Sequence, residues 1–271
     1  MAQTVKIISD STCDLSKDLL EKYDISILPL HILLGETEYR DGVDITPETS
    51  APSMTEAMEV MKPFLDEGRE IICFSISDSM STSGNVMRLA AEELEASDKV
   101  TVINSANLST GIGLQVIQAA LLSAEGKTRA QITAAIEEIR PRVRASFTVD
   151  TLTYLYRGGR CNAVAALAGT MLKLHPRIVV EDGAMDASKK YRGKLSSVIL
   201  SYTKDMEDDL KNAVPDRVFI THTGCDREIV ESVRSYFDSL GIINEILETR
   251  AGGVISSHCG PGTLGVLFIE K

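Results

Sequence analysis

Residues 70–104 read EIICFSISDSMSTSGNVMRLAAEELEASDKVTVIN, and this stretch establishes the pattern of the whole chain. Its opening segment, EIICFSI, is an apolar run of the length expected for a strand buried on both faces. A hydroxyl-rich turn, DSMSTSGN, then begins a helix, and KVTVIN forms the next strand. A strand, a helix and a strand with short connections predict two parallel strands with the helix as their crossover.

The same alternation continues toward the N-terminus. TVKIIS, residues 4–9, is a strand, and Ser16 can cap a helix over residues 17–23. ISILPLHILL is extended chain interrupted by Pro29, and GETEYRDG indicates a hairpin after it. Further helices follow residue 104, so we expect a mostly parallel sheet with helices on both faces in a domain spanning residues 1–145.

The second half of the chain, residues 146–271, has a different pattern. PRIVVEDGAMDASKKYRGK contains two strands around Asp182-Gly183, which is a strong signal for a two-residue hairpin turn. A helix over residues 195–211 follows, then the strand RVFITH, another helix, the strand INEILE and a terminal strand. This order predicts a second α/β domain with a mixed sheet and helices.

The composition is that of an acidic globular protein. The 271 residues include 39 acidic and 28 basic side chains, for a net charge of −11. Phosphate backbones and anionic membrane surfaces repel such a chain, which argues against nucleic-acid and membrane-surface partners. No apolar run of about 18 residues occurs, and the N-terminus does not read as a signal peptide. The five cysteines form no C-x-x-C pair, so we expect reduced thiols in a cytoplasmic protein without stable membrane insertion.

Two hydroxyl-rich loops precede helices and are candidate anion-binding sites. SISDSMSTSGN, residues 75–85, follows a buried strand, and ligands bind at the strand ends of open parallel sheets. Hydroxyls and free N–H groups at a helix N-terminus suit a carboxylate or a phosphate. TSAPS, residues 49–53, has a similar arrangement before another helix. Ordinary helix capping explains both loops as well, and for TSAPS it is the simpler interpretation.

Two segments of the second domain are also candidates. YLYRGGR, residues 154–160, places two arginines around a glycine pair, and a guanidinium can hold a carboxylate or phosphate through two parallel hydrogen bonds. Arg157 equally suits the last turn of a helix that Gly158 ends. The helix predicted over residues 163–174 is rich in small residues, which indicates close packing and could leave space beside it.

The C-terminal stretch, GGVISSHCGPGTLGVLFIEK, places His258 among glycines. Gly260, Gly262 and Gly265 spell G-x-G-x-x-G, but the six residues that follow are strand-like, so we reject a dinucleotide site. The glycines more plausibly shape a tight turn near a ligand. His258 itself could be a base, a metal ligand or a ligand clamp.

Two kinds of chemistry have weak support. A zinc site would require two distant loops to meet, and the spacing of its ligands does not favour it. Its four ligands would be His222, Cys225, His258 and Cys259. The chain has no P-loop and no G-x-S-x-G elbow, so any serine nucleophile would have an unfamiliar arrangement.

Taken together, these stretches resemble the DegV family of bacterial fatty-acid-binding proteins. IISDSTCDLS, YRDGVDIT, TSAPS, SMSTSGN, YLYRGGR, KLHPRIVVEDGAM and SSHCGPGTLGVLF occur in the family's order and cover nearly the whole chain. The resemblance implies two α/β domains with a long-chain fatty acid at their junction, and no cofactor, metal or catalytic residue. It also implies a soluble carrier that presents the carboxylate to a separate fatty-acid kinase.

The resemblance assigns roles to individual residues. The carboxylate is held by Thr49 of TSAPS and by Ser81 of the serine loop, with Thr82 beside it. His258 lies near the head group and is positioned for phosphoryl transfer by the partner, and Arg160 belongs to the partner surface. The acyl chain occupies an apolar tunnel whose expected lining is Ala163, Ala166, Leu167, Thr170 and Met171.

The sequence departs from the family's pattern at two places. The segment around residues 46–49 is shorter than usual, so we expect a different pocket mouth. Thr82 stands where relatives usually have glycine, which changes the serine loop. The residues also leave open a hydrolase or phosphotransferase that uses Ser81 with His258, and a binding module for another small organic acid.

Overall fold

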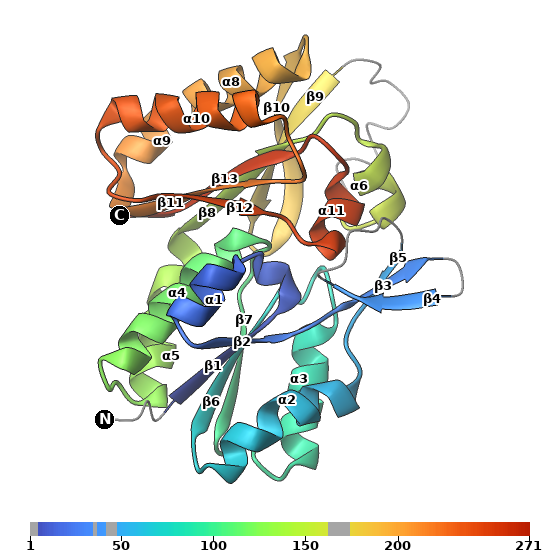
Figure 1. Ribbon diagram of the computed structural model, residues 1–271, viewed down its shortest axis with the longest axis vertical. Coiled ribbons are helices and arrows are strands. Elements are labelled where there is room, and N and C mark those ends of the chain that lie inside the picture. The colour runs from blue at the N-terminus through green and yellow to red at the C-terminus, as the bar shows by residue number, and fades with distance from the viewer. Residues whose placement is uncertain (1–4, 35–36, 42–47, 162–173) are drawn as a thin grey trace.

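The computed structural model describes residues 5–34, 37–41, 48–161 and 174–271. Its two halves are stacked, with the N-terminal half below and the C-terminal half above in Figure 1. Each half contains a sheet with helices packed against it, as the sequence predicts. Among the described residues, no helix combines the length and apolar character needed to cross a bilayer.

The N-terminal half is built on a four-stranded sheet in which every pairing is parallel. Its strands, in spatial order, are β2 (Ile25–Leu28), β1 (Val5–Asp10), β6 (Glu70–Ser75) and β7 (Val100–Asn104). One face carries α1 (Lys17–Lys22), α4 (Thr110–Ala124) and α5 (Arg129–Ile139), and the other carries α2 (Met54–Asp66) and α3 (Ser83–Glu93). The predicted parallel sheet, covered on both faces, is therefore confirmed.

Local signals explain where these helices begin. Ser16 caps α1 as predicted, because its hydroxyl accepts the N–H of Leu19. Ser53 and Glu56 form a capping box at the start of α2, in which each side chain accepts the other residue's backbone N–H. Two short 3-10 helices, η1 (Ser11–Cys13) and η2 (Arg140–Arg142), follow β1 and α5.

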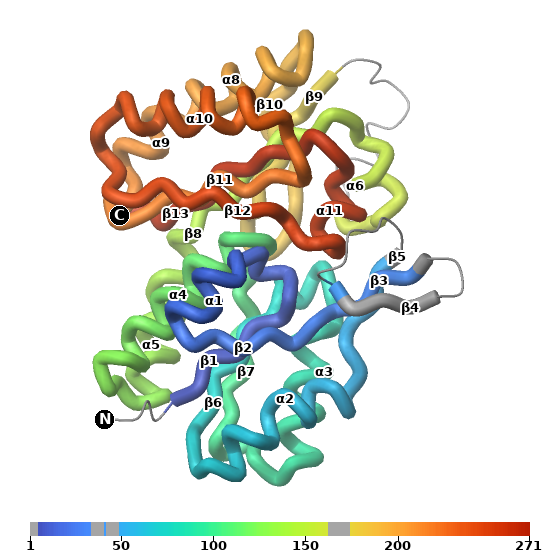
Figure 2. The backbone as a smooth tube through the Cα atoms, in the orientation of Figure 1, coloured from blue at the N-terminus to red at the C-terminus, as the bar shows by residue number. Residues whose placement is uncertain are grey.

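A small antiparallel sheet extends from the side of the molecule (Figure 2). It consists of β3 (His31–Leu34) between β4 (Thr37–Arg40) and β5 (Glu48–Ser50), which confirms the hairpin predicted from GETEYRDG. Both β3 and β5 contact α11 (Gly253–Cys259) of the C-terminal half. The small sheet therefore brings residues near position 50 to the junction of the two halves.

The C-terminal half contains a six-stranded mixed sheet. Its strands, in spatial order, are β10 (Ala184–Arg192), β9 (Leu174–Glu181), β8 (Val143–Thr148), β13 (Leu264–Glu270), β11 (Ala213–His222) and β12 (Ile246–Arg250). Only the β11–β12 pairing among these is parallel. One face is covered by α8 (Leu195–Asp205), α9 (Glu207–Lys211) and α10 (Arg227–Leu240), while α6 (Thr153–Gly158) lies at one end beside α11. The predicted mixed sheet is confirmed.

Two predicted boundaries in this half are wrong. The helix expected over residues 195–211 breaks at Met206, whose φ of −91° and ψ of 2° leave the helical region. The break lets Met206 and Leu210 both reach the core, where each is 1% exposed. The strand expected from residue 243 begins only at Ile246, because the N–H of Asn244 turns to the carbonyl of Pro215.

Helix α4 lies between the two large sheets and is buried on nearly all sides. Its side chains pack on β1 and β6 of the first sheet and on β8 and β13 of the second. One continuous core therefore contains Ile112 of α4 together with Phe74 of β6 and Phe147 of β8. The domain boundary predicted after residue 145 falls within β8 and stays a prediction.

Candidate functional site

A cavity of about 350 Å³ lies where the two halves meet. This volume is within the range of roughly 300–1,000 Å³ that is usual for small-molecule sites. Its wall includes the serine loop after β6, the start of α3, β5 and α11. The cavity thus forms beyond the carboxyl end of a parallel strand, where ligands bind in open α/β sheets.

The structure brings five predicted site residues to this cavity. The wall includes Thr49, Ser81, Thr82, Arg160 and His258, which come from distant parts of the chain. The roles assigned to them remain predictions, because the structure shows only that these residues lie close together. The predicted acyl-tunnel residues lie outside the described part of the chain, and these are Ala163, Ala166, Leu167, Thr170 and Met171.

The apolar part of the wall comes from side chains to which the sequence analysis assigned no role. They are contributed by five separate segments of both halves and include Leu30, Ile76, Met80, Leu108, Met185, Val254 and Ile255. Each of these side chains is at most 8% exposed. Their apolar character alone could not identify them, because ordinary core residues have the same composition.

His258 lies in the last turn of the short helix α11. The stretch around His258 suggested a glycine turn, but the turn begins only at Gly260, so His258 belongs to the helix before it. Its Nε2 is hydrogen-bonded to Oγ1 of Thr49 at 2.9 Å, which joins α11 to β5. Burial, reinforced by the positive charge of Arg160, lowers the pKa of His258 to about 4. The imidazole is therefore neutral near pH 7 and can donate one hydrogen bond and accept another.

A glycine permits the imidazole to occupy this position. A Cβ atom added to Gly158 would lie 2.2 Å from Nδ1 of His258, closer than non-bonded atoms can approach. Gly158 is the last residue of α6, and Gly159 is the residue that adopts the left-handed conformation at its C-cap, with φ of 66°. The predicted ending of this helix at Gly158 is thus confirmed, while Gly158 itself accommodates His258.

Two hydroxyls of the TSAPS segment have different contacts. Ser53 caps α2, which confirms the simpler interpretation for that residue. Thr49 lies in β5, and its hydroxyl faces His258 across the cavity wall. Residues 42–47 lie outside the described chain, so the predicted change at the pocket mouth stays a prediction.

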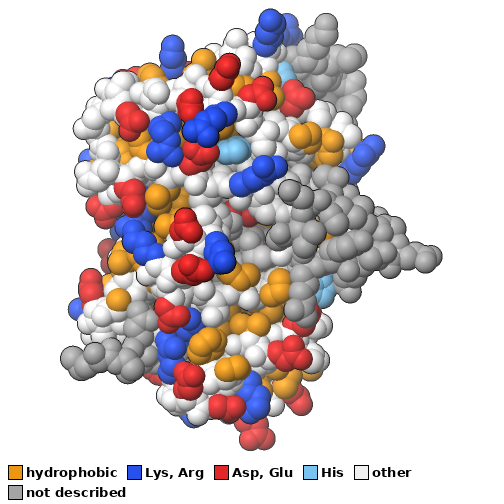
Figure 3. Space-filling model, in the orientation of Figure 1, with side chains coloured by type: hydrophobic (Ala, Val, Ile, Leu, Met, Phe, Trp, Pro, Cys, Tyr) orange, Lys and Arg blue, Asp and Glu red, His pale blue; other side chains and the backbone are white. Residues whose placement is uncertain are grey.

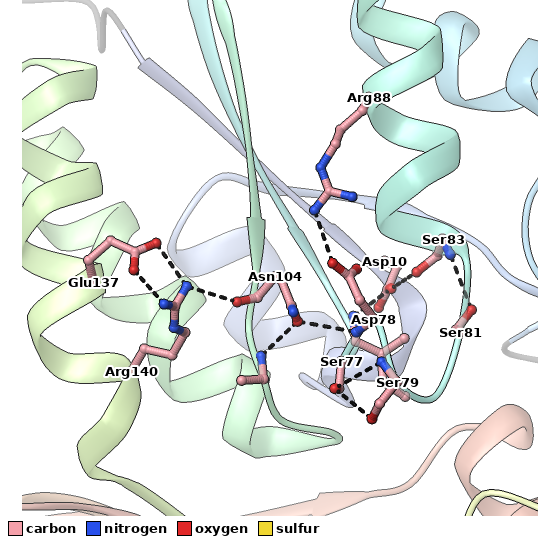
Figure 4. A network of polar contacts seen from close by, with 12 residues as sticks. Asp10, Ser77, Asp78, Ser79, Ser81, Ser83, Arg88, Asn104, Glu137 and Arg140 are labelled. Atoms are coloured by element: carbon pink, nitrogen blue, oxygen red, sulfur yellow. Dashed lines mark hydrogen bonds and ion pairs between the residues drawn. The ribbon is translucent and has the colours of Figure 1, made fainter. Parts of the chain in front are cut away.

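The serine loop, residues 76–82, is held in place by the buried carboxyl group of Asp10 (Figure 4). Asp10 at the end of β1 accepts the N–H of Ile76 at 2.9 Å and the hydroxyl of Ser83 at 2.8 Å. Ser81 Oγ accepts the N–H of Ser83 at 3.2 Å, so its own hydroxyl hydrogen remains available to another acceptor. Thr82 is the N-cap of α3 without a side-chain cap bond. The loop therefore presents hydroxyls and a helix N-terminus to the cavity.

Of the two charged side chains at the cavity, Asp78 has an ion-pair partner and Arg160 has no such partner among the described residues. Asp78 also lines the wall, but Arg88 pairs with it at 3.2 Å (Figure 4). Arg160 donates to the carbonyls of Gly158 and Met80 and, within the described chain, has no carboxylate partner. A bound anion would therefore meet Arg160 as an uncompensated positive charge at the cavity.

Two aspartate side chains of the N-terminal half hold the start of α11. Asp14 accepts the N–H of Gly252 at 2.8 Å, and Asp41 accepts the N–H of Val254 at 3.2 Å. Burial raises the pKa of Asp14 to about 8, against the hydrogen bonds from Ser109 and Gly252 that lower it. These bonds fix the helix that carries His258 to the first half.

The weaker alternatives from the sequence have no geometric support. Nδ1 of His222 accepts the N–H groups of Gly224 and Cys225, which occupies one ring nitrogen of that histidine. In the described part of the chain, no group of three or more His, Cys, Asp or Glu side chains could hold a metal ion. Gly260 and Gly262 follow a helix and precede strand β13, the reverse of the strand, glycine and helix order of a dinucleotide motif.

The surface shown in Figure 3 has mixed charge. Basic and acidic side chains are interspersed over the described part of that face, in both halves of the molecule. This face offers no continuous basic stripe among its described residues, such as a nucleic-acid backbone would require.

Comparisons with known proteins agree with the fold and with the family resemblance of the sequence. The family model described as an uncharacterised protein of the DegV family matches residues 4–271. A DegV domain-containing protein of Clostridium perfringens is 31% identical, with 98% of this chain and 99% of the relative covered.

Two solved structures are similar over almost their entire length. A DegV family protein from Thermus thermophilus, described by its fatty acid binding, has a TM-score of 0.90 at 29% identity, covering 99% of this chain and 100% of that one. A stearic acid-binding protein from Eubacterium ventriosum has a TM-score of 0.84 at 30% identity, covering 98% of both chains.

Proposed function

The chain belongs to the DegV family, and from this premise we propose that it is a carrier of a long-chain fatty acid, bound in the cavity between its two halves. One observation carries the proposal: hydroxyl and imidazole donors and apolar side chains line the same cavity. The solved relatives described as fatty acid binding support the same ligand class.

The polar part of the wall suits a carboxylate. A buried carboxylate needs hydrogen-bond donors, because leaving it unpaired in an apolar site is costly. Ser81 has a free hydroxyl hydrogen, and the neutral His258 with Thr49 can direct one more hydrogen toward a ligand oxygen. Arg160 adds a positive charge that, in the part of the chain that the structure describes, donates to carbonyls alone.

The apolar part of the wall suits an acyl chain. Each methylene removed from water contributes about 0.8 kcal/mol, so a chain of 16 to 18 carbons supplies ample binding free energy even when only part is buried. Leu108 and Ile255 lead from the cavity into a smaller space between α11 and the second sheet, which they also line. This direction supports a ligand whose tail extends toward the C-terminal half.

We propose further that the carrier presents the carboxylate to a separate kinase and performs no chemistry itself. A general base is effective when its pKa lies near the working pH, and the low pKa of His258 makes it a poor one. His258 is bonded to Thr49, whereas the hydroxyl of Ser81 accepts from the backbone of Ser83. These contacts support a head-group clamp over a hydrolase that pairs Ser81 with His258.

Extraction followed by mass spectrometry tests the ligand directly. Purified protein should yield about one fatty acid per chain, and delipidated protein should bind it again at micromolar concentration. Thr49→Val and Ser81→Ala should each weaken binding about tenfold, because each removes a donor to a charged oxygen. Ser257→Ala is the matched control, since its hydroxyl lies on the same helix as His258 but donates to the carbonyl of Val254.

Two results would contradict the proposal. Protein that contains no lipid and also refuses added long-chain acid would exclude a fatty-acid carrier. Short organic acids that compete as strongly as palmitate would favour a module for small acids, because the apolar wall would then contribute nothing.

A further inference from the structure

The tip of the β9–β10 hairpin reaches the serine loop of the other half. Asp182 and Gly183 have φ values of 48° and 78°, as the two central residues of a type I′ turn require. The carbonyl of Gly183 accepts hydrogen bonds from the hydroxyls of Ser77 at 2.6 Å and Ser79 at 2.5 Å. A hairpin turn from the second sheet is thus bonded to the loop that carries Ser81.

The backbone of Ser77 makes three hydrogen bonds that hold that loop. Its carbonyl accepts the N–H groups of Met80 at 2.8 Å and Ser81 at 3.1 Å, while its own N–H donates to the carbonyl of Asn107. Its side chain is buried, with 2% of the residue exposed, and the residue is not part of the cavity wall. The backbone of Ser77 therefore sets the position of Ser81, and its hydroxyl connects that backbone to the C-terminal half.

The packing around the turn is too tight for any side chain at Gly183. A Cβ atom there would lie 2.6 Å from Oγ of Ser77, whereas the next nearest atom, Cα of Ala106, would be 3.5 Å away. The hydroxyl of Ser77 thus fills the space that a side chain on the hairpin turn would need. Without that hydroxyl, the nearest atom to a Cβ on Gly183 would be Cα of Ala106, at an ordinary van der Waals distance.

We infer that Ser77 is a positioning residue for the ligand's head group: through its bond to the Gly183 carbonyl it holds Ser81 in the place where its hydroxyl reaches the cavity. This inference rests on the proposed function, since it concerns the carboxylate end of the same site. The hairpin turn of the second sheet thereby contributes to head-group recognition, although Asp182 and Gly183 do not line the cavity.

The inference is tested by comparing a fatty acid with the fatty alcohol of equal length. Both ligands bury the same chain, but only the acid has a charged head group that depends strongly on Ser81. Ser77→Ala should weaken binding of the acid about tenfold and change binding of the alcohol by less than about threefold. Ser123→Ala is the matched control, because its buried hydroxyl donates to the carbonyl of Val5 at 2.6 Å, away from the cavity.

A double-mutant cycle tests the contact between the halves. Gly183→Ala carries the cost of a positive φ in every background, but its collision with the Ser77 hydroxyl occurs only when that hydroxyl is present. Gly183→Ala should therefore weaken acid binding at least fivefold in the wild-type protein, and by much less in the Ser77→Ala protein.

The outcomes separate the two proposals. Wild-type protein that binds neither ligand would overturn the proposed function and the inference with it. Wild-type protein that binds the acid, with a Ser77→Ala variant that binds it equally well, would overturn the positioning role alone. Equal losses for acid and alcohol would do the same, because they would indicate a general structural defect.

Discussion

Replacing His258 should change how the stability of the ligand-free protein depends on pH. The folded protein keeps this side chain neutral, with a pKa of about 4 against the ordinary value of 6.5. Between these two pH values the unfolded chain binds a proton that the folded protein does not bind, so the free energy of unfolding falls as pH decreases. The stability that depends on the neutral His258 is fully present above pH 6.5. It is lost progressively as pH falls from 6.5 to 4.

The magnitude follows from the size of the pKa shift. One pH unit corresponds to about 1.4 kcal/mol, and pH 5 lies about 1.5 units below the ordinary histidine value, so the loss between pH 7 and pH 5 is about 2 kcal/mol. His258→Gln removes the titrating group and keeps a polar side chain. The wild-type protein should therefore lose about 2 kcal/mol more than the variant over this range.

Urea unfolding of delipidated protein at a series of pH values measures the effect. The comparison with a variant is needed because other groups titrate as well: Asp14, with its pKa raised to about 8, makes the protein less stable as pH increases toward that value. The free energy of unfolding of His258→Asn should change with pH at the same slope as that of His258→Gln, with at most a constant offset between the two curves. Parallel curves for wild type and variants between pH 7 and pH 5 would refute the burial argument for His258.

Three further predictions follow from the contacts at and around the site. Gly158→Ala should displace the imidazole of His258 and weaken fatty-acid binding about tenfold in a titration, while circular dichroism shows that the fold is preserved. Unchanged affinity would contradict the packing of Gly158 on His258. Arg160→Ala should reduce transfer of the acid to an added kinase more than it reduces binding, and a variant that transfers at the wild-type rate would remove Arg160 from the partner surface. Tyr202→Phe should lower the free energy of unfolding by about 1–3 kcal/mol in urea, because its hydroxyl bonds both Ser146 and the N–H of Val266 in the core; an unchanged midpoint would contradict this.

The parts of the fold that depend on local pattern were predictable. The parallel sheet follows from apolar runs that alternate with helices, and the β9–β10 hairpin follows from Asp182-Gly183, which suit the two positive φ values of its turn. The polar site residues were indicated by short motifs. Thr49, Ser81 and His258 are far apart in sequence, and the structure brings all three to one cavity.

The remaining features depend on contacts between distant segments. Met206 breaks a helix because two core side chains must reach the same interior, and no glycine or proline stands beside it to end the helix. The apolar wall is assembled from separate segments whose residues resemble any core. Helix α4 did carry a signal, because TGIGLQVIQAALLSA is apolar on every side, a pattern typical of a helix enclosed by the protein.

That enclosed helix limits how a lipid could enter or leave the proposed carrier. Since α4 is packed against both sheets at once, moving the two halves apart as rigid bodies would expose a continuous apolar interior to water. We expect the halves to stay together throughout the exchange cycle and to unfold in one cooperative transition. Loading and unloading then depend on small movements of side chains and loops at the cavity wall, so the residence time of the lipid can be tuned by local substitutions while the architecture stays intact.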